Sequence, residues 1–345
     1  MCVYNIVFQS SSIDGWFSGY LTGQLAAGSD DLVFFHPIDA RTPDTWPAPE
    51  KLAPASIAPE SMFEPGSAKR QKQTNGKAFC FFIDCTPTSP NNTVNSEYLL
   101  DIAKDFNVII IDNNPIAGSI SRATTKLMVI HDSSATTIQL VWQHFGCACA
   151  SMPDWVQQVD RIESWKMDHN DLAIREKLLE ICRLPTMGRL EEAMAQTTNY
   201  LAYFKDKEFA ATYLAEAAEK IKNKIAGFAP LLAGLHDIEL TVADCGRWGF
   251  PLTWAGMNFL YVDTTGSAPD SSELAAYALA IHGGDAFVNF RKRVHPGGEV
   301  YYVYSARASS TSTINLVEAG SPFKGFERSA GASISALEYC VPFVK

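Results

Sequence analysis

The sequence predicts an α/β fold, with a mostly parallel, doubly wound sheet first, a helical connector next and a smaller α/β domain last. Two observations predict the sheet. Five strand-like runs alternate with helical stretches, which is the pattern of a parallel sheet. Near-continuous apolar runs such as NVIII are typical of strands buried on both faces. A chain of 345 residues, 47% of them hydrophobic, can also bury enough surface for two domains.

The first strand is predicted at residues 3–8, where an apolar run ends at three serines. Asp14 and Gly15 then predict a turn, and the aromatic and apolar residues of 16–21 have helical spacing. This interpretation puts Asp14 at the carboxyl end of a strand, where open α/β sheets bind ligands. Further strands are predicted at residues 32–35, 78–83, 108–111 and 126–130, and a helix at 133–145.

Residues 37–77 interrupt this pattern with seven prolines between 37 and 65, too many for regular structure. We interpret them as a surface insertion in a first domain of residues 1–170. Loops of this length are usually functional or disordered, so the alternatives are an arm that binds a protein partner, a lid, or a passive segment.

Residues 171–235 have helical periodicity and are predicted to be the connector. The second domain, residues 236–345, is predicted to have strands at 237–245, 257–262, 286–290, 300–305 and 334–341, with a helix at 272–282.

The composition limits partners and compartment. A net charge of −10 repels polyanions, so contact with nucleic acid would need a local basic patch. We interpret KRQK at 69–72 as a solvated loop. No apolar stretch reaches the roughly 20 residues of a membrane span, and no signal peptide is evident. Eight cysteines without paired C-x-x-C spacing indicate reduced thiols. We therefore expect a cytoplasmic protein without membrane contact.

Four acidic residues are predicted to fall just past strand ends in the first domain, where they can converge at one edge of the sheet: Asp14, Asp84, Asp112 and Asp160. Carboxylates that converge repel one another unless a cation or a proton lies between them, and such clusters commonly bind divalent metals. The alternative is that each one caps a turn or a helix. The residues alone favour a metal site and a capping role equally.

In order and spacing, these segments resemble the DHH phosphoesterase superfamily over nearly the whole chain. S-S-S-I-D-G at 10–15 stands where the family has H-x-D-x-D-G, and I-D-C at 83–85 stands where its middle strand ends in Asp. D-N-N at 112–114 replaces D-H-H, and V-D-R at 159–161 is similar to a later helix with Asp. The segment 131–142 is similar to the family's serine-led helix. YSARAS at 304–309 and GFERSAGAS at 325–333 are similar to the S-x-R strand and glycine-rich phosphate loop of the DHHA1-like substrate domain.

The resemblance implies a two-metal site that is half retained. At the first ion, the family's His and Asp correspond to Ser10 and Ser12. At the second ion, three carboxylates remain and an amide replaces an imidazole, so the implied ligands are Asp14, Asp84, Asn113 and Asp160. An oxygen-only set suits a hard cation, and we expect at most one Mg²⁺ or Mn²⁺.

The replaced residues affect the implied hydrolysis of a phosphoester more than the implied binding of its phosphate. A two-metal phosphoesterase neutralises both the attacking and the leaving oxygen, which one ion cannot do. The family's candidate general acid corresponds to Asn114, which exchanges no proton near neutral pH. Phe326 replaces the His of the glycine-rich loop. The residues implied to attract a substrate phosphate are still basic: Arg307, Lys324 and Arg328.

These observations favour a catalytically inactive DHH-like protein that acts as a binding or structural subunit of a larger assembly. Its expected ligand is a small phosphorylated compound or nucleotide in the cleft between the domains, and its proline-rich insertion is the expected contact with a protein partner. The alternative is a divergent phosphoesterase that cleaves short oligonucleotides or cyclic nucleotides with one Mg²⁺ or Mn²⁺, with Asp84 and Asn114 as candidate catalytic residues. A third hypothesis is a plain α/β scaffold whose acids are caps.

Overall fold

A computed structural model describes residues 2–335 except 29, 40–45, 53–76, 90, 92, 121–123, 147–149, 168, 249, 268, 296, 310, 320 and 327–328. It consists of two compact units. Unit 1 comprises Met1–Asp160 and Leu178–Asp206, and unit 2 comprises Arg161–Lys177 and Lys207–Lys345. No helix in the described part of the chain is both long and apolar enough to span a membrane.

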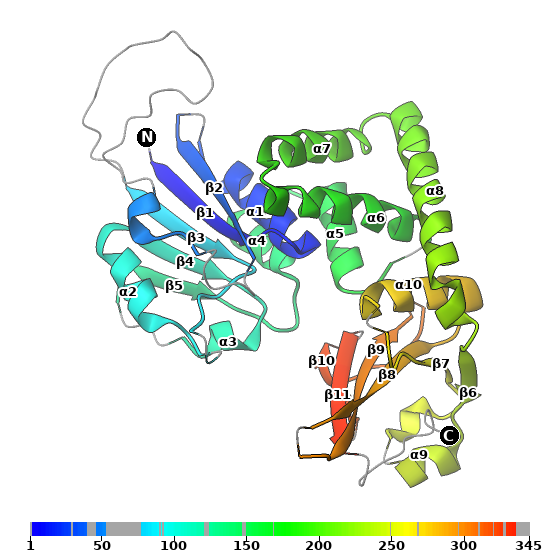
Figure 1. Cartoon of the computed structure of the whole chain (residues 1–345). Coiled ribbons are helices and arrows are strands. Elements are labelled where there is room, and N and C mark those ends of the chain that lie inside the picture. Colours follow the sequence, from blue (N-terminus) through cyan, green and yellow to red (C-terminus); the bar gives the residue numbers. More distant parts are fainter. Residues whose placement is uncertain are drawn as a thin grey trace. The chain divides into compact units, whose positions relative to one another are not determined.

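Unit 1 is built on a parallel sheet, as the sequence predicts (Figure 1). Its described strands are β1 (Val3–Gln9), β2 (Leu32–Ile38), β3 (Ala78–Ile83), β4 (Asn107–Ile111) and β5 (Leu127–Ile130), in the order β2-β1-β3-β4-β5. Every residue of β1 is buried, which explains its lack of polar alternation.

Helices cover both faces of this sheet. Leu99 and Ile102 of α2 (Ser96–Asp105) pack with Val7 on one face. On the other face, Trp16 of α1 (Ile13–Ala26) contacts Phe8, with ring centroids 5.4 Å apart. The other helices of this unit are α3 (Pro115–Gly118), α4 (Thr137–Phe145), α7 (Leu190–Ala202), most of α5 (Asp154–Glu163), the end of α6 (His169–Arg183), and the 3₁₀ turns η2 (Pro49–Lys51) and η3 (Pro185–Met187).

Three predictions in this unit are corrected. Strand β2 continues through Pro37 to Ile38, and it tolerates the proline because it is an edge strand with no partner needed on that side. Of the predicted insertion, residues 40–45 and 53–76 lie outside the described residues, whereas Leu52 is buried in the core. Helix α4 begins at Thr137, not at 133, because Thr136 is its N-cap and accepts a hydrogen bond from the Gln139 amide.

Unit 2 contains a mixed sheet in the order β10-β11-β9-β8-β7-β6. Its strands are β6 (His236–Glu239), β7 (Asn258–Asp263), β8 (Ala286–Val294), β9 (Val300–Ala308), β10 (Lys324–Phe326) and β11 (Ser329–Ser335). Strands β7 and β8 are parallel and joined by α10 (Ser271–His282), and the other pairs are antiparallel. Helices α8 (Lys207–Leu232) and α9 (Val242–Trp248), the turn η4 (Leu252–Trp254), the end of α5 and most of α6 also belong to this unit.

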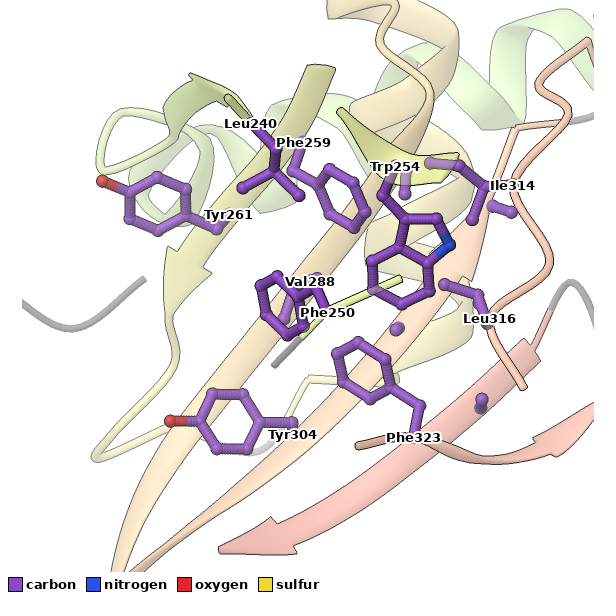
Figure 2. Packing of buried hydrophobic residues seen from close by; sticks show 14 of the residues in the cluster. Leu240, Phe250, Trp254, Phe259, Tyr261, Val288, Tyr304, Ile314, Leu316 and Phe323 are labelled. Atoms are coloured by element: carbon purple, nitrogen blue, oxygen red, sulfur yellow. The ribbon is translucent and has the colours of Figure 1, made fainter. Parts of the chain in front are cut away.

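Alternate residues of this sheet serve two different cores. One face carries Phe259, Val288 and Tyr304, which belong to the same buried cluster as Trp254 (Figure 2). The other face carries Leu260, Val262 and Phe287, which pack under α10. The two faces of β8 and β9 are therefore chemically distinct.

Three predictions in unit 2 are corrected. The strand expected at 237–245 ends at Glu239, because Thr241 and Asp244 form a reciprocal capping box that starts α9. The expected glycine-rich loop is instead a pair of strands in which Phe326 is opposite Ser329. The strand expected at 334–341 begins earlier, at Ser329 in β11, and residues 336–341 lie outside the described residues.

Candidate carboxylate site at the edge of the parallel sheet

The first acid of the site, Asp14, lies in the first turn of α1 and not in the turn that the sequence predicts. Ser12 is the N-cap, and its hydroxyl accepts a hydrogen bond from the Gly15 amide at 2.8 Å. Gly15 is required by the tight connection between β1 and α1, since a Cβ there would lie 2.1 Å from the Gln9 carbonyl oxygen. This connection holds Asp14 at the carboxyl edge of the sheet with 4% of its surface exposed.

Asp14 accepts hydrogen bonds from the N-terminus of a second helix. The Thr137 and Ile138 amides of α4 each donate to it at 2.7 Å, and the Ser18 hydroxyl donates at 3.0 Å. The first amides of a helix have no partner within the helix, so the carboxylate satisfies two of them. Burial raises the pKa of Asp14 to about 6, the three hydrogen bonds oppose this, and the charge of Asp160 adds to it.

Asp84 follows β3 in a left-handed backbone conformation, with φ of 54°. Its two oxygens accept hydrogen bonds from the Ser12 hydroxyl at 2.7 Å and the Thr137 hydroxyl at 3.0 Å. The pKa of Asp84 is raised well above its usual value, first by burial of the carboxyl group and then by the charges of Asp14 and Asp112. Ser12 and Thr137 lower it in part, because their hydrogen bonds favour the charged form.

The remaining two acids follow the same pattern. Asp112 accepts hydrogen bonds from the Thr86 hydroxyl at 2.6 Å and the Asn114 amide at 2.9 Å, and burial raises its pKa. Asp160 accepts from the Thr136 hydroxyl at 2.6 Å. The prediction that Asp160 belongs to the carboxyl edge through a strand end is wrong, because it lies in helix α5.

The structure brings the four predicted acids into one electrostatic group. Asp84 interacts with Asp14 and with Asp112, and Asp14 interacts with Asp160. Each acid also accepts at least one hydroxyl hydrogen bond, so the acids neither simply converge nor simply cap. The cluster combines mutual repulsion with a local set of neutral donors.

The side chains of the two predicted amide residues, Asn113 and Asn114, contribute less to the carboxylate cluster than the four acids do. Asn114 is exposed and is the N-cap of α3, where its side chain accepts from the Ile116 amide at 3.1 Å. Asn113 is partly buried beside it. Ser10, which the resemblance implies to stand in place of a metal ligand, donates to the Ile38 carbonyl at 2.9 Å and so ties β1 to β2. These contacts give Ser10 and Asn114 structural roles.

A divalent ion does not fit this arrangement as it stands. No three His, Cys, Asp or Glu side chains in the described ranges are close enough to hold a metal together. The hydroxyl hydrogens of Ser12 and Thr137 point to the oxygens of Asp84 that an ion would need. Binding one Mg²⁺ or Mn²⁺ would require these donors to turn away from the carboxylate.

Sequence reasoning missed Thr136 and Thr137, which contact three of the four acids. A signal for them exists. T-x-x-Q at 136–139 is a capping-box pattern, and it places the start of a helix, with its free amides, immediately after Thr136. The contacts of Thr137 with Asp14 and Asp84 join residues far apart in the chain, and no local sequence pattern predicts them.

The predicted phosphate residues lie in unit 2. The Arg307 guanidinium donates to the Ser305 hydroxyl at 3.2 Å, the Ala306 carbonyl at 2.8 Å and the Ser272 hydroxyl at 2.8 Å, and lies over the Trp165 ring. Burial lowers its pKa to about 10, so it remains charged at neutral pH. Lys324 belongs to β10, its side chain lies outside the described part, and Arg328 lies outside the described residues altogether.

Comparisons with known proteins assign no family. No protein-family model matches the chain, and no curated protein matches it. Among solved structures, it is similar to the crystal structure of an uncharacterized protein from Helicobacter pylori G27, with 12% sequence identity and a TM-score of 0.29. That alignment covers 97% of this chain and 93% of the other. A TM-score at this level does not establish a shared fold.

Proposed function

We propose that this chain is a DHH-like protein that has given up two-metal hydrolysis and works by binding, as a structural or nucleotide-sensing subunit of an assembly. One observation carries the proposal: both oxygens of Asp14 and both oxygens of Asp84 accept hydrogen bonds from groups of the chain itself. An ionised carboxylate has about four acceptor positions, so the two acids offer about eight, of which protein donors take five.

The chemistry of the donors supports the same conclusion. Hydroxyl and amide groups stabilise a charged carboxylate by hydrogen bonds. They do not lower the pKa of a water molecule, which is the task of a metal pair in phosphoester hydrolysis. The position of the family's candidate general acid is Asn114, whose side chain caps α3. Asn114 cannot supply the proton that a leaving group needs, since its amide does not titrate near neutral pH.

The competing function, a phosphoesterase with one Mg²⁺ or Mn²⁺, is favoured by a different observation. Asp84 has a left-handed backbone conformation that costs a non-glycine residue energy, and such strain is concentrated at functional sites. Three neighbouring acids with raised pKa values are also typical of active sites. A cation would relieve their repulsion.

Titration calorimetry of Mn²⁺ and Mg²⁺ into the chelator-stripped protein separates the two functions, with Asp84→Asn as the variant. Asp84→Asn keeps the side-chain volume and removes the charge. The binding role predicts no saturable site in either protein and no cleavage of short oligonucleotides or cyclic dinucleotides with either metal. A site that is present in the natural chain, is lost in Asp84→Asn and supports cleavage would refute it.

A gain-of-function control uses the positions where the resemblance places lost ligands. The triple variant Ser10→His, Ser12→Asp, Asn113→His restores the ligand types of the family. Metal binding by the triple variant and not by the natural chain would support the proposal that hydrolysis was lost through these positions.

A further inference from the structure

The strands β8 and β9 carry a basic surface in an acidic protein. Residues 286–308 contain four basic side chains, Arg291, Lys292, Arg293 and Arg307, and one acidic side chain, Glu299. The whole chain has a net charge of −10. Lys292 and Arg293 are exposed, and no described acidic side chain forms an ion pair with Arg291, Lys292 or Arg293.

The register places two of these arginines on the same face as α10. Side chains alternate along a strand, so Arg291 and Arg293 share a face of β8 with Phe287, which packs under α10. Their cross-strand partners are Val303 and Tyr301 of β9. Because directly opposed residues point to the same side, these four side chains form one surface.

This surface continues past the end of α10. The helix begins at Ser271, whose hydroxyl accepts a hydrogen bond from Asn289 at 3.2 Å. Strand β7 also stops pairing with β8 at Phe290, opposite Asp263. Arg291 and Arg293 therefore lie beyond the paired part of β7 and beyond the first residue of α10, on the long β8 strand of Figure 1. The loop after β7 stays beside β8 as far as Lys292, whose amide donates to the Thr265 hydroxyl at 2.9 Å.

An aromatic pair completes the surface. The rings of Tyr301 and His295 are stacked, with centroids 4.4 Å apart and planes 29° apart. Tyr301 is directly opposite Arg293. The hairpin thus places the Tyr301 ring next to two arginines, Arg291 and Arg293. The Cα atoms of these arginines are about 6.8 Å apart, because they are two residues apart along a strand.

We propose that this face of the β8–β9 hairpin, formed by Arg291, Arg293, His295, Tyr301 and Val303, binds single-stranded nucleic acid. The inference rests on the proposed binding role and names its ligand. Arginines contact successive parts of the phosphate backbone, and an aromatic ring stacks on an unpaired base irrespective of its identity. Stacking requires bases that are free of a duplex, which favours a single strand over double-stranded nucleic acid. The acidic remainder of the protein confines the contact to this face.

Fluorescence anisotropy with the full chain and a labelled single strand of roughly 12 nucleotides, within the range of known site sizes, tests the proposal. Affinity is measured at several salt concentrations for the natural chain, Arg291→Gln/Arg293→Gln and Tyr301→Ala. Each phosphate contact contributes about 0.7 to the slope of log K against log salt for single strands, so loss of two arginines reduces the slope by about 1.4. Loss of the stacked ring weakens binding by at least about fivefold.

The matched control is Lys205→Gln/Lys222→Gln, which removes the same charge from two exposed lysines outside the hairpin. We expect this lysine variant to change the slope of log K against log salt by less than Arg291→Gln/Arg293→Gln does. The Tyr301→Phe variant keeps the ring and retains affinity. Thermal unfolding of each variant shows whether the fold is intact.

Three results would overturn the proposal: no binding by the natural chain at low salt, equal losses in the lysine control and the arginine variant, or equal affinity for duplex and single strand. Full competition by poly-glutamate would likewise show attraction by charge alone. The outcome is separable from that of the proposed function, because metal-dependent cleavage at the carboxylates can be found whether or not the hairpin variants lose affinity for the strand.

Discussion

Replacing Thr137 by valine tests the role of the hydroxyl donors directly. Valine has nearly the same shape as threonine, and Thr137 has no exposed surface, so the change removes a buried hydroxyl and leaves an Asp84 oxygen without that donor. The hydroxyl donates to Asp84 at 3.0 Å, whereas the amide of residue 137 still donates to Asp14. The substitution therefore affects one hydrogen bond in a buried carboxylate cluster.

The magnitude follows from the charge of the acceptor. A hydrogen bond to a charged group contributes about 1.5–3 kcal/mol, and one between neutral groups about 1 kcal/mol. We expect Thr137→Val to lower the free energy of unfolding by about 2 kcal/mol where Asp84 is ionised. The loss becomes smaller at acid pH, because the hydroxyl favours the charged form of Asp84 and lowers its pKa.

Urea denaturation measures the loss, and hydrogen exchange at the Ile138 amide reports on unit 1 by itself. Thr137→Ser keeps the hydroxyl and is the control for side-chain packing. A double-mutant cycle with Asp84→Asn isolates the pair, and we expect a coupling energy of about 1–3 kcal/mol.

A Thr137→Val variant as stable as the natural chain, or no more affected than Thr137→Ser, would refute the view that this hydroxyl neutralises Asp84. So would a loss that does not depend on pH.

Other predictions concern charge, close packing and capping. Because burial raises the pKa of Asp14 from 3.8 to about 6, the folded chain holds this proton more tightly than the unfolded chain, and stability falls as pH rises through that window. The fall is about 3 kcal/mol at 1.36 kcal/mol per pKa unit, and Asp14→Asn should lack it in denaturation curves measured against pH. Gly15→Ala should destabilise by about 1–3 kcal/mol or more through the clash with the Gln9 carbonyl, whereas Gly227→Ala, with nothing near its Cβ, should stabilise α8 by up to about 1 kcal/mol. Asp270→Ala should cost about 1 kcal/mol in thermal unfolding, since this N-cap accepts from two amides of α10.

The parallel sheet of unit 1 was predictable because its inner strands β1 and β3 are almost fully buried, which leaves long apolar runs in the sequence. Strand β3 begins and ends where the sequence predicts, at Ala78 and Ile83. Errors occur where a polar side chain caps the backbone. Thr136 delays the start of α4, and the reciprocal contacts of Thr241 and Asp244 convert an expected strand into α9. A capping hydrogen bond of about 1 kcal/mol outweighs a weak local preference for strand.

The sequence by itself determined which side chains are available to the site: four acids, no histidine at the positions where the DHH pattern has its ligands, and serines and an asparagine there instead. Only the tertiary structure decided what those acids face. The hydroxyls that contact Asp84 come from residues 72 and 53 positions away in the chain. Periodicity and propensity describe neighbours along the chain, whereas a buried carboxylate is satisfied by whichever donors the packing of α1 and α4 brings to it.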